Sequence, residues 1–183
     1  MPSKDEIMNK AADFFSRLSL RYKFILITTL AIVVFMSIIG YVAVEREKNI
    51  LYNEVEKQGR LLGETLAIPI INDLIYERLG LVEEGGLLDN YILEIFNRKD
   101  VDLLYIAILD EEGKVISHNN ITEYGKVYAD PVTINTLKAD RTTIQRIPAG
   151  KHEALDFGVP LSIGKKRWGS LKFSISLEKV ERE

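Results

Sequence analysis

Cysteine is absent from this sequence, which excludes disulfide bonds and thiolate metal sites. The sequence also lacks a glycine-rich phosphate-binding loop and an HExxH zinc-protease motif. Its two histidines, His118 and His152, have no motif spacing, so a zinc site that combines them with Asp156 is only an alternative to solvated loop histidines. We therefore expect no catalytic constellation, no cofactor and no metal in this chain.

The chain as a whole also has no excess of basic residues. The net charge is −3 over 183 residues, and residues 1–23 carry five Lys or Arg against three Asp or Glu. Residues 24–44 carry no charge, so residues 45–183 are acidic, at −5. Such a segment has no electrostatic footprint for a nucleic acid partner.

A long apolar run is present, however, and the rest of the chain is organised around it. Residues 24–44 (FILITTLAIVVFMSIIGYVAV) contain no charged side chain. As a helix, 21 residues reach roughly 30 Å, the thickness of a bilayer's hydrocarbon core, so we predict a transmembrane helix. The alternatives are a buried core helix, which is usually shorter, and a signal peptide, whose small-residue cleavage pattern is missing here.

The basic residues before the span predict its orientation. Residues 1–23 form a basic tail, which we expect on the cytoplasmic side of a bacterial inner membrane, with the acidic part outside. Within the tail, Glu6–Leu20 has helical apolar spacing and is either an amphipathic helix on the membrane surface or a partly ordered segment.

A long signalling helix is predicted over residues 45–80. It continues the span without a strong breaker until Pro69, where we expect a kink or a restart. Four apolar residues at spacings of four, seven and four predict a parallel homodimer seam: Leu51, Val55, Leu62 and Leu66.

Residues 81–178 are predicted to form a small α+β domain. A turn at residues 83–86 precedes an amphipathic helix over residues 87–96, and a polar loop covers residues 119–129. Asp130 and Pro131 are typical of the start of a helix. Residues 179–183 are predicted to form the first turn of an exit helix that leads toward a possible second span. The remaining patterns predict a helix over 131–139 and strands over 103–109, 114–118, 142–147, 154–161 and 168–177.

This order predicts one five-stranded antiparallel sheet with the long helix packed across one face. Residues 45–180 resemble the Cache (PDC) domains, PAS-like extracytoplasmic sensors of bacterial histidine kinases, chemoreceptors and diguanylate cyclases. The resemblance is carried by Tyr105–His118, a strand–Asp-x-x-Gly–strand hairpin, by Val159-Pro160-Leu161 with Trp168-Gly169-Ser170-Leu171, and by Leu66-Ala67-Ile68-Pro69.

The resemblance implies that the sheet face away from the long helix encloses a small molecule. Ser170, Lys172 and Ser174 alternate with apolar residues on the last strand, so Lys172 could neutralise a carboxylate ligand while the serines donate hydrogen bonds. Depending on strand register, further contributions are expected from Tyr105, His118, Thr143, Arg146 and Asp156. The alternative is a solvated face, and neither the amino-acid signature nor the dicarboxylate cluster of better-defined subtypes is found.

Two functions remain open from the sequence. The first is a membrane-anchored sensor that signals through its helix and span to an output module beyond this chain. The second is a single-span structural component of a pilus or secretion platform, whose ferredoxin-like domains interleave helices with strands.

Overall fold

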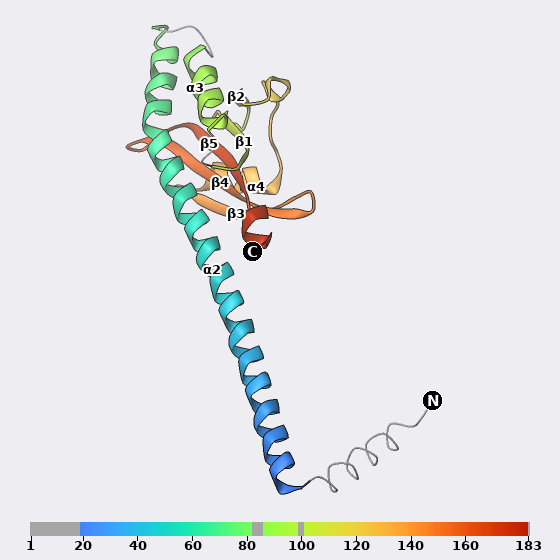
Figure 1. The fold of residues 1–183 in the computed structure, drawn as a ribbon. Helices are drawn as coiled ribbons and strands as arrows, with labels where there is room; N and C mark the ends of the chain where they lie inside the picture. The colour runs from blue at the N-terminus through green and yellow to red at the C-terminus, as the bar shows by residue number, and fades with distance from the viewer. Residues whose placement is uncertain (1–18, 82–85, 99–100, 183) are drawn as a thin grey trace. The chain divides into compact units, whose positions relative to one another are not determined.

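The computed structural model describes residues 19–81, 86–98 and 101–182 (Figure 1). The chain divides into two compact units, Met1–Glu47 and Lys48–Glu183. The predicted amphipathic helix Glu6–Leu20 falls almost entirely on residues 1–18, which lie outside the described ones. The predicted turn at residues 83–86 likewise falls largely outside them.

Helix α2 (Leu20–Arg78) contains the apolar run of the first unit. Its most apolar window has a mean hydropathy of 2.5 and no buried residue, so by length and composition it can cross a membrane. Two hydroxyls in this run donate to carbonyl oxygens of the preceding turn, Thr28 to Phe24 (2.9 Å) and Ser37 to Val33 (2.8 Å). These two hydroxyls are thereby satisfied within the helix, as an apolar solvent requires.

The second unit holds the C-terminal part of α2, which does not restart at Pro69. Proline removes one backbone hydrogen bond, but Ile70, Ile71 and Leu74 immediately after it are buried in the core. We attribute the unbroken helix to this burial, which fixes both sides of the proline. The helix ends at Arg78, close to the predicted end at residue 80.

Three of the four residues predicted as a dimer seam belong to the core between α2 and the sheet or pack against it. Leu66 is buried in the core, and Val55 and Leu62 pack against it. At Val55, Leu62 and Leu66 the heptad-like spacing therefore serves packing within the chain, and the predicted dimer seam stays a prediction that the burial of Leu66 disfavours.

The sheet is antiparallel and has the strand order β2-β1-β5-β4-β3. First and last strands are neighbours, as a PAS-like sheet requires, and β3 to β5 follow one another without an intervening helix. The α+β class is confirmed, and the described helices and strands of this unit match the predicted ones with shifts of one or two residues at most ends. The strand bounds are β1 Leu103–Leu109, β2 Val115–His118, β3 Thr143–Ala149, β4 His152–Ile163 and β5 Lys166–Ser176.

One face of the sheet carries the main core. Helices α2 and α3 (Gly86–Phe96) cover it, as Figure 1 shows. Phe157 of β4 and Phe173 of β5 are paired across the strands on this face, and their rings stack with centroids 4.9 Å apart. On the opposite face lies the short helix α4 (Pro131–Lys138), and α5 (Glu178–Arg182) follows the last strand.

The predicted turn and cap chemistry is found in the structure. Asp110 Oδ1 accepts hydrogen bonds from the backbone N–H groups of Glu112 (2.9 Å) and Lys114 (2.8 Å), and so closes the β1–β2 hairpin. Asp130 caps α4, because its Oδ1 accepts the backbone N–H of Thr133 at 3.0 Å.

Two glycines allow α2 to approach the sheet closely. A Cβ at Gly59 would lie 2.2 Å from Cζ of Phe157, and one at Gly63 would lie 2.6 Å from Cγ2 of Val159 and 2.9 Å from Cε1 of Phe173. The backbone of α2 therefore rests directly on the stacked phenylalanines.

We expect Gly59→Ala to destabilise the chain. Alanine adds about 1 kcal/mol of helix propensity, but overpacking of a dense core costs about 1–3 kcal/mol, so the net effect is a loss. The measurement is denaturant unfolding of the full chain, with Gly40→Ala as the control because nothing lies within 4 Å of that position. A Gly59→Ala protein at least as stable as the parent would contradict the described packing.

Candidate functional site

A cavity of about 530 Å³ lies on the sheet face that α4 covers. Its walls come from four kinds of element: the strands, the loop after β2, the 3₁₀ turn Ile121–Glu123, and the first turn of α4. The lining residues are Leu104, Tyr105, His118, Asn119, Asn120, Glu123, Tyr128, Asp130, Val132, Thr133, Ile147, Asp156 and Lys172.

Helix α4 is held against the sheet by two features. A Cβ at Gly158 of β4 would lie 2.1 Å from Oγ1 of Thr136, so only glycine lets the helix sit this close. At this same C-terminal end of the helix, the Arg167 guanidinium donates to the carbonyl oxygens of Thr136 and Ala139, both at 2.9 Å, and to Oγ of Ser170 at 2.8 Å. These contacts hold the C-terminal half of α4 on the sheet, while its first turn lines the cavity.

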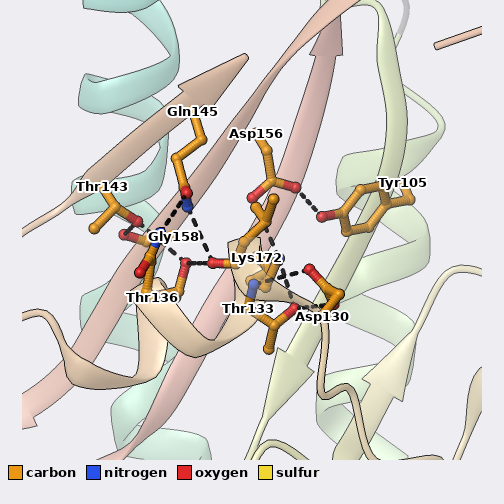
Figure 2. Close-up of polar contacts among 11 residues, drawn as sticks. Tyr105, Asp130, Thr133, Thr136, Thr143, Gln145, Asp156, Gly158 and Lys172 are labelled. Atoms are coloured by element: carbon orange, nitrogen blue, oxygen red, sulfur yellow. Dashed lines mark hydrogen bonds and ion pairs between the residues drawn. The ribbon is translucent and has the colours of Figure 1, made fainter. Parts of the chain in front are cut away.

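A chain of polar contacts crosses the cavity wall from β1 to α4 (Figure 2). The Tyr105 hydroxyl donates to Oδ2 of Asp156, whose Oδ1 lies 3.3 Å from Nζ of Lys172. The ammonium of Lys172 donates to Oγ1 of Thr133 at 2.9 Å, and Thr133 in turn donates to Oδ2 of Asp130 at 2.7 Å. Five side chains from four elements are thus connected in one series.

The central pair of this series is buried. The side chains of Lys172 and Asp156 are 3% and 1% exposed. Burial raises the pKa of Asp156, and the nearby ammonium of Lys172 opposes that rise. Burial also raises the pKa of the Tyr105 phenol, and the charge of Asp156 raises it further, so Tyr105 stays a hydrogen-bond donor at neutral pH.

At the outer end of the series, burial would raise the pKa of Asp130. The hydrogen bonds from the side chain and backbone of Thr133 outweigh this effect and lower the pKa. Asp130 therefore carries its negative charge at neutral pH.

His118 and the loop after β2 complete the site. Its imidazole stacks on Tyr105 with ring centroids 5.9 Å apart, and its Nδ1 accepts the backbone N–H of Asn120 at 2.8 Å. Burial lowers the pKa of His118, so the ring is neutral at pH 7 with its proton on Nε2. Glu123 accepts the Tyr128 hydroxyl at 2.9 Å.

The strand register determines which of the predicted site residues reach the cavity. Tyr105, His118, Lys172 and Asp156 are brought together in the cavity wall. The other expected hydroxyls share this sheet face but do not line the cavity, since they are taken up in contacts around α4 or lie deeper in the strand: Thr143, Ser170 and Ser174.

Arg146 is excluded from the site by its register. It pairs with Leu155, a core residue of the helix-covered face, and its guanidinium lies 4.1 Å from the ring centroid of Tyr52 in α2. The expectation that it faces the ligand is therefore wrong. Likewise the zinc alternative finds no support, because no group of three His, Asp or Glu in the described parts of the chain could hold a metal.

Sequence reasoning missed the residues that the loop and α4 contribute. Four of these line the cavity from segments that lie 23 to 49 positions before Asp156 and Lys172, and no periodicity connects them with β4 and β5: Glu123, Tyr128, Asp130 and Thr133. The only local signal was the cap pattern Asp130-Pro131, which fixes where α4 begins and hence where Thr133 lies.

Comparison with known proteins gives a family match. The family model described as Single cache domain 3 matches residues 46–183. No curated protein sequence matches the chain.

Several solved structures are also among the matches. The sensor domain of E. coli DcuS has 18% sequence identity and a TM-score of 0.46, over 57% of this chain and 79% of that one. A domain of a sensory box/GGDEF family protein from Vibrio parahaemolyticus has 16% identity and a TM-score of 0.48, over 77% and 59%. The sensor domain of the V. cholerae histidine kinase DctB has 12% identity and a TM-score of 0.43, over 69% and 57%. The chain therefore spans less than two thirds of the last two.

We expect Lys172→Met to destabilise the chain by about 3–5 kcal/mol, because it leaves the carboxylate of Asp156 buried without its cation. Adding Asp156→Asn should recover most of that loss, since the double variant removes both charges. Denaturant unfolding of the two single variants and the double variant gives the coupling energy. Strictly additive effects would show that the two side chains do not interact.

Proposed function

The chain belongs to the Single cache domain 3 family, and on this premise we propose that it is a membrane-anchored sensor of a small molecule. The ligand would occupy the cavity between the sheet and α4. The observation that carries this proposal is the cavity itself, about 530 Å³ in size and lined by polar side chains from separate elements. Ligand sites of proteins have this character, a concave space with a few convergent polar groups.

The proposed location is a bacterial inner membrane. The apolar run of α2 would form the single span of this chain, with the basic residues 1–23 in the cytoplasm and the sensor domain outside. The excess of basic residues before the span supports this orientation.

The proposed route of the signal runs through β4 and β5 to α2. Successive residues of a strand face opposite sides of its sheet, so Asp156 and Lys172 in the cavity wall are followed by Phe157 and Phe173 on the helix side. These two rings contact α2 at Gly59 and Gly63. A ligand that moves the cavity wall would therefore act on the helix that continues into the span.

The output would belong to a module outside this chain, namely a histidine kinase, a chemoreceptor or a cyclase, because nothing in this chain indicates an enzymatic activity. The family match and the strand order disfavour the pilus or secretion component, whose domains interleave helices with strands.

We expect a cavity-filling substitution to separate ligand binding from stability. Thermal unfolding of the full chain in nanodiscs is screened against a panel of organic acids, amino acids, amines and sugars. At a hundredfold excess over its Kd, a ligand contributes about 2.7 kcal/mol, which corresponds to a midpoint shift of several degrees.

Leu104→Trp should abolish this shift because Leu104 lines the cavity, whereas Leu93→Trp on α3 should preserve it. The two leucines are matched in exposure, at 44% and 43%. The proposal fails if no compound shifts the midpoint, or if the shift persists in Leu104→Trp.

We further propose that the chain signals as a homodimer. Two copies anchored in one membrane in the same orientation can bring identical helix faces together in parallel. Within residues 48–78, the sheet-facing side of α2 is occupied, and the large apolar residues that remain exposed form a stripe at spacings of eleven, seven and eight: Ile50, Leu61, Ile68 and Tyr76.

The absence of native cysteine makes this testable by cross-linking. We expect Ile68→Cys to form a disulfide-linked dimer in oxidised proteoliposomes, and Arg60→Cys, exposed on another side of the helix, to remain monomeric on a reducing-agent-free gel. Equal cross-linking of both variants, or preferential linkage through Arg60→Cys, would count against this face.

A further inference from the structure

The charge of the cavity wall is negative. Three carboxylates, Glu123, Asp130 and Asp156, line it against one ammonium, that of Lys172. Lys126 pairs with Glu123 at 2.8 Å but is not among the lining residues, and including it still leaves one more negative than positive group. His118 adds no charge at neutral pH, because burial lowers its pKa.

The single ammonium in the wall is already engaged. Nζ of Lys172 lies 3.3 Å from Oδ1 of Asp156 and donates to Thr133 at 2.9 Å, and its side chain is 3% exposed. A carboxylate ligand would therefore have to displace Asp156 from its own cation and approach Asp130 as well. Both changes bring like charges together in a partly desolvated space, which is unfavourable.

A second observation concerns the buried carboxylate of Asp156. Among the residues that the structure describes, its Oδ1 is in ion-pair contact with Nζ of Lys172 at 3.3 Å and accepts no well-formed hydrogen bond. A carboxylate oxygen can accept more than one hydrogen bond, so a donor from a ligand would add to this contact. An ammonium group supplies such donors, and a carboxylate supplies none.

The rest of the wall suits an organic body. The rings of Tyr105, His118 and Tyr128 line the cavity together with Leu104, Val132 and Ile147. Aromatic faces attract cations, and the apolar side chains provide a surface for hydrocarbon.

From these observations we infer that the cavity binds a small organic cation, a protonated amine with an apolar or aromatic body, rather than a carboxylate. The inference rests on the proposed function, since it concerns the ligand of the same cavity. It also replaces the role that the sequence suggested for Lys172, which here stabilises Asp156 and Thr133 instead of receiving an anion.

The test uses three series of compounds with the same carbon skeletons and different charge: benzylamine, benzyl alcohol and benzoate, each with homologues lengthened by one to three methylene groups. Binding to the full chain is measured by thermal shift and by calorimetry, in nanodiscs of uncharged lipid so that the membrane does not attract the amines. At least one amine should bind, the matching alcohol more weakly and the carboxylate not detectably, and the amine affinity should fall with added salt.

Two matched variants localise the charge. Asp130→Asn keeps the cap of α4, since asparagine is an equally good N-cap residue, but removes the charge, so it should weaken amine binding by about 3- to 10-fold. Asp140→Asn makes the same chemical change at an exposed position outside the cavity wall and should leave the affinity unchanged.

Each outcome is decisive. Binding of carboxylates in preference to amines, abolished by Leu104→Trp, would overturn the inference and leave the ligand-sensing function intact. Failure of every amine to bind, or amine binding indifferent to Asp130→Asn, would also overturn it. If in addition no compound of the broader metabolite panel bound, the proposed function itself would fall.

Discussion

The structure depends on a buried ion pair between the two central strands of the sensor domain. Asp156 on β4 and Lys172 on β5 lie in the cavity wall, and the residues that follow them, Phe157 and Phe173, carry α2 on the other side of the sheet. Because successive side chains of a strand point to opposite faces of the sheet, β4 and β5 contribute both to the cavity wall and to the surface that contacts α2. The proposed route of the signal therefore needs no more than a shift of these two strands.

A buried pair is an unusual choice for stability alone, because desolvation can cost as much as the attraction returns. Here the pair also determines position. Lys172 holds Thr133, Thr133 holds Asp130, and Asp130 caps α4, so the wall of the cavity opposite the sheet is connected to the strands by hydrogen bonds. This arrangement leaves an excess of negative charge in the cavity wall, on which our inference of a cationic ligand rests.

The sequence predicted the elements well because local patterns determine them. The strand Leu103–Leu109, the Asp110 turn and the Asp130-Pro131 helix start follow from burial periodicity, side-chain acceptors and proline geometry within a few residues. The site was predicted only in part. Tyr105, His118 and Lys172 line the cavity as expected. Arg146 faces the other side of the sheet, because its side depends on the strand register, which no local pattern predicts. The spacing of Val55, Leu62 and Leu66 was ambiguous for a related reason, because a heptad-like pattern looks the same whether the partner is another helix or the chain's own sheet.

The most direct test of the account is whether the two sheet faces respond together. 4-Fluorophenylalanine at Phe157 reports the helix side, and the same label at Phe96, at the end of α3, serves as a reference outside the strands. During titration of the full chain with the compound that stabilises it most, we predict that the ¹⁹F resonance of the Phe157 label shifts with occupancy while that of the Phe96 label changes less. An unchanged resonance at Phe157 with the cavity saturated would contradict the coupling of the cavity to α2.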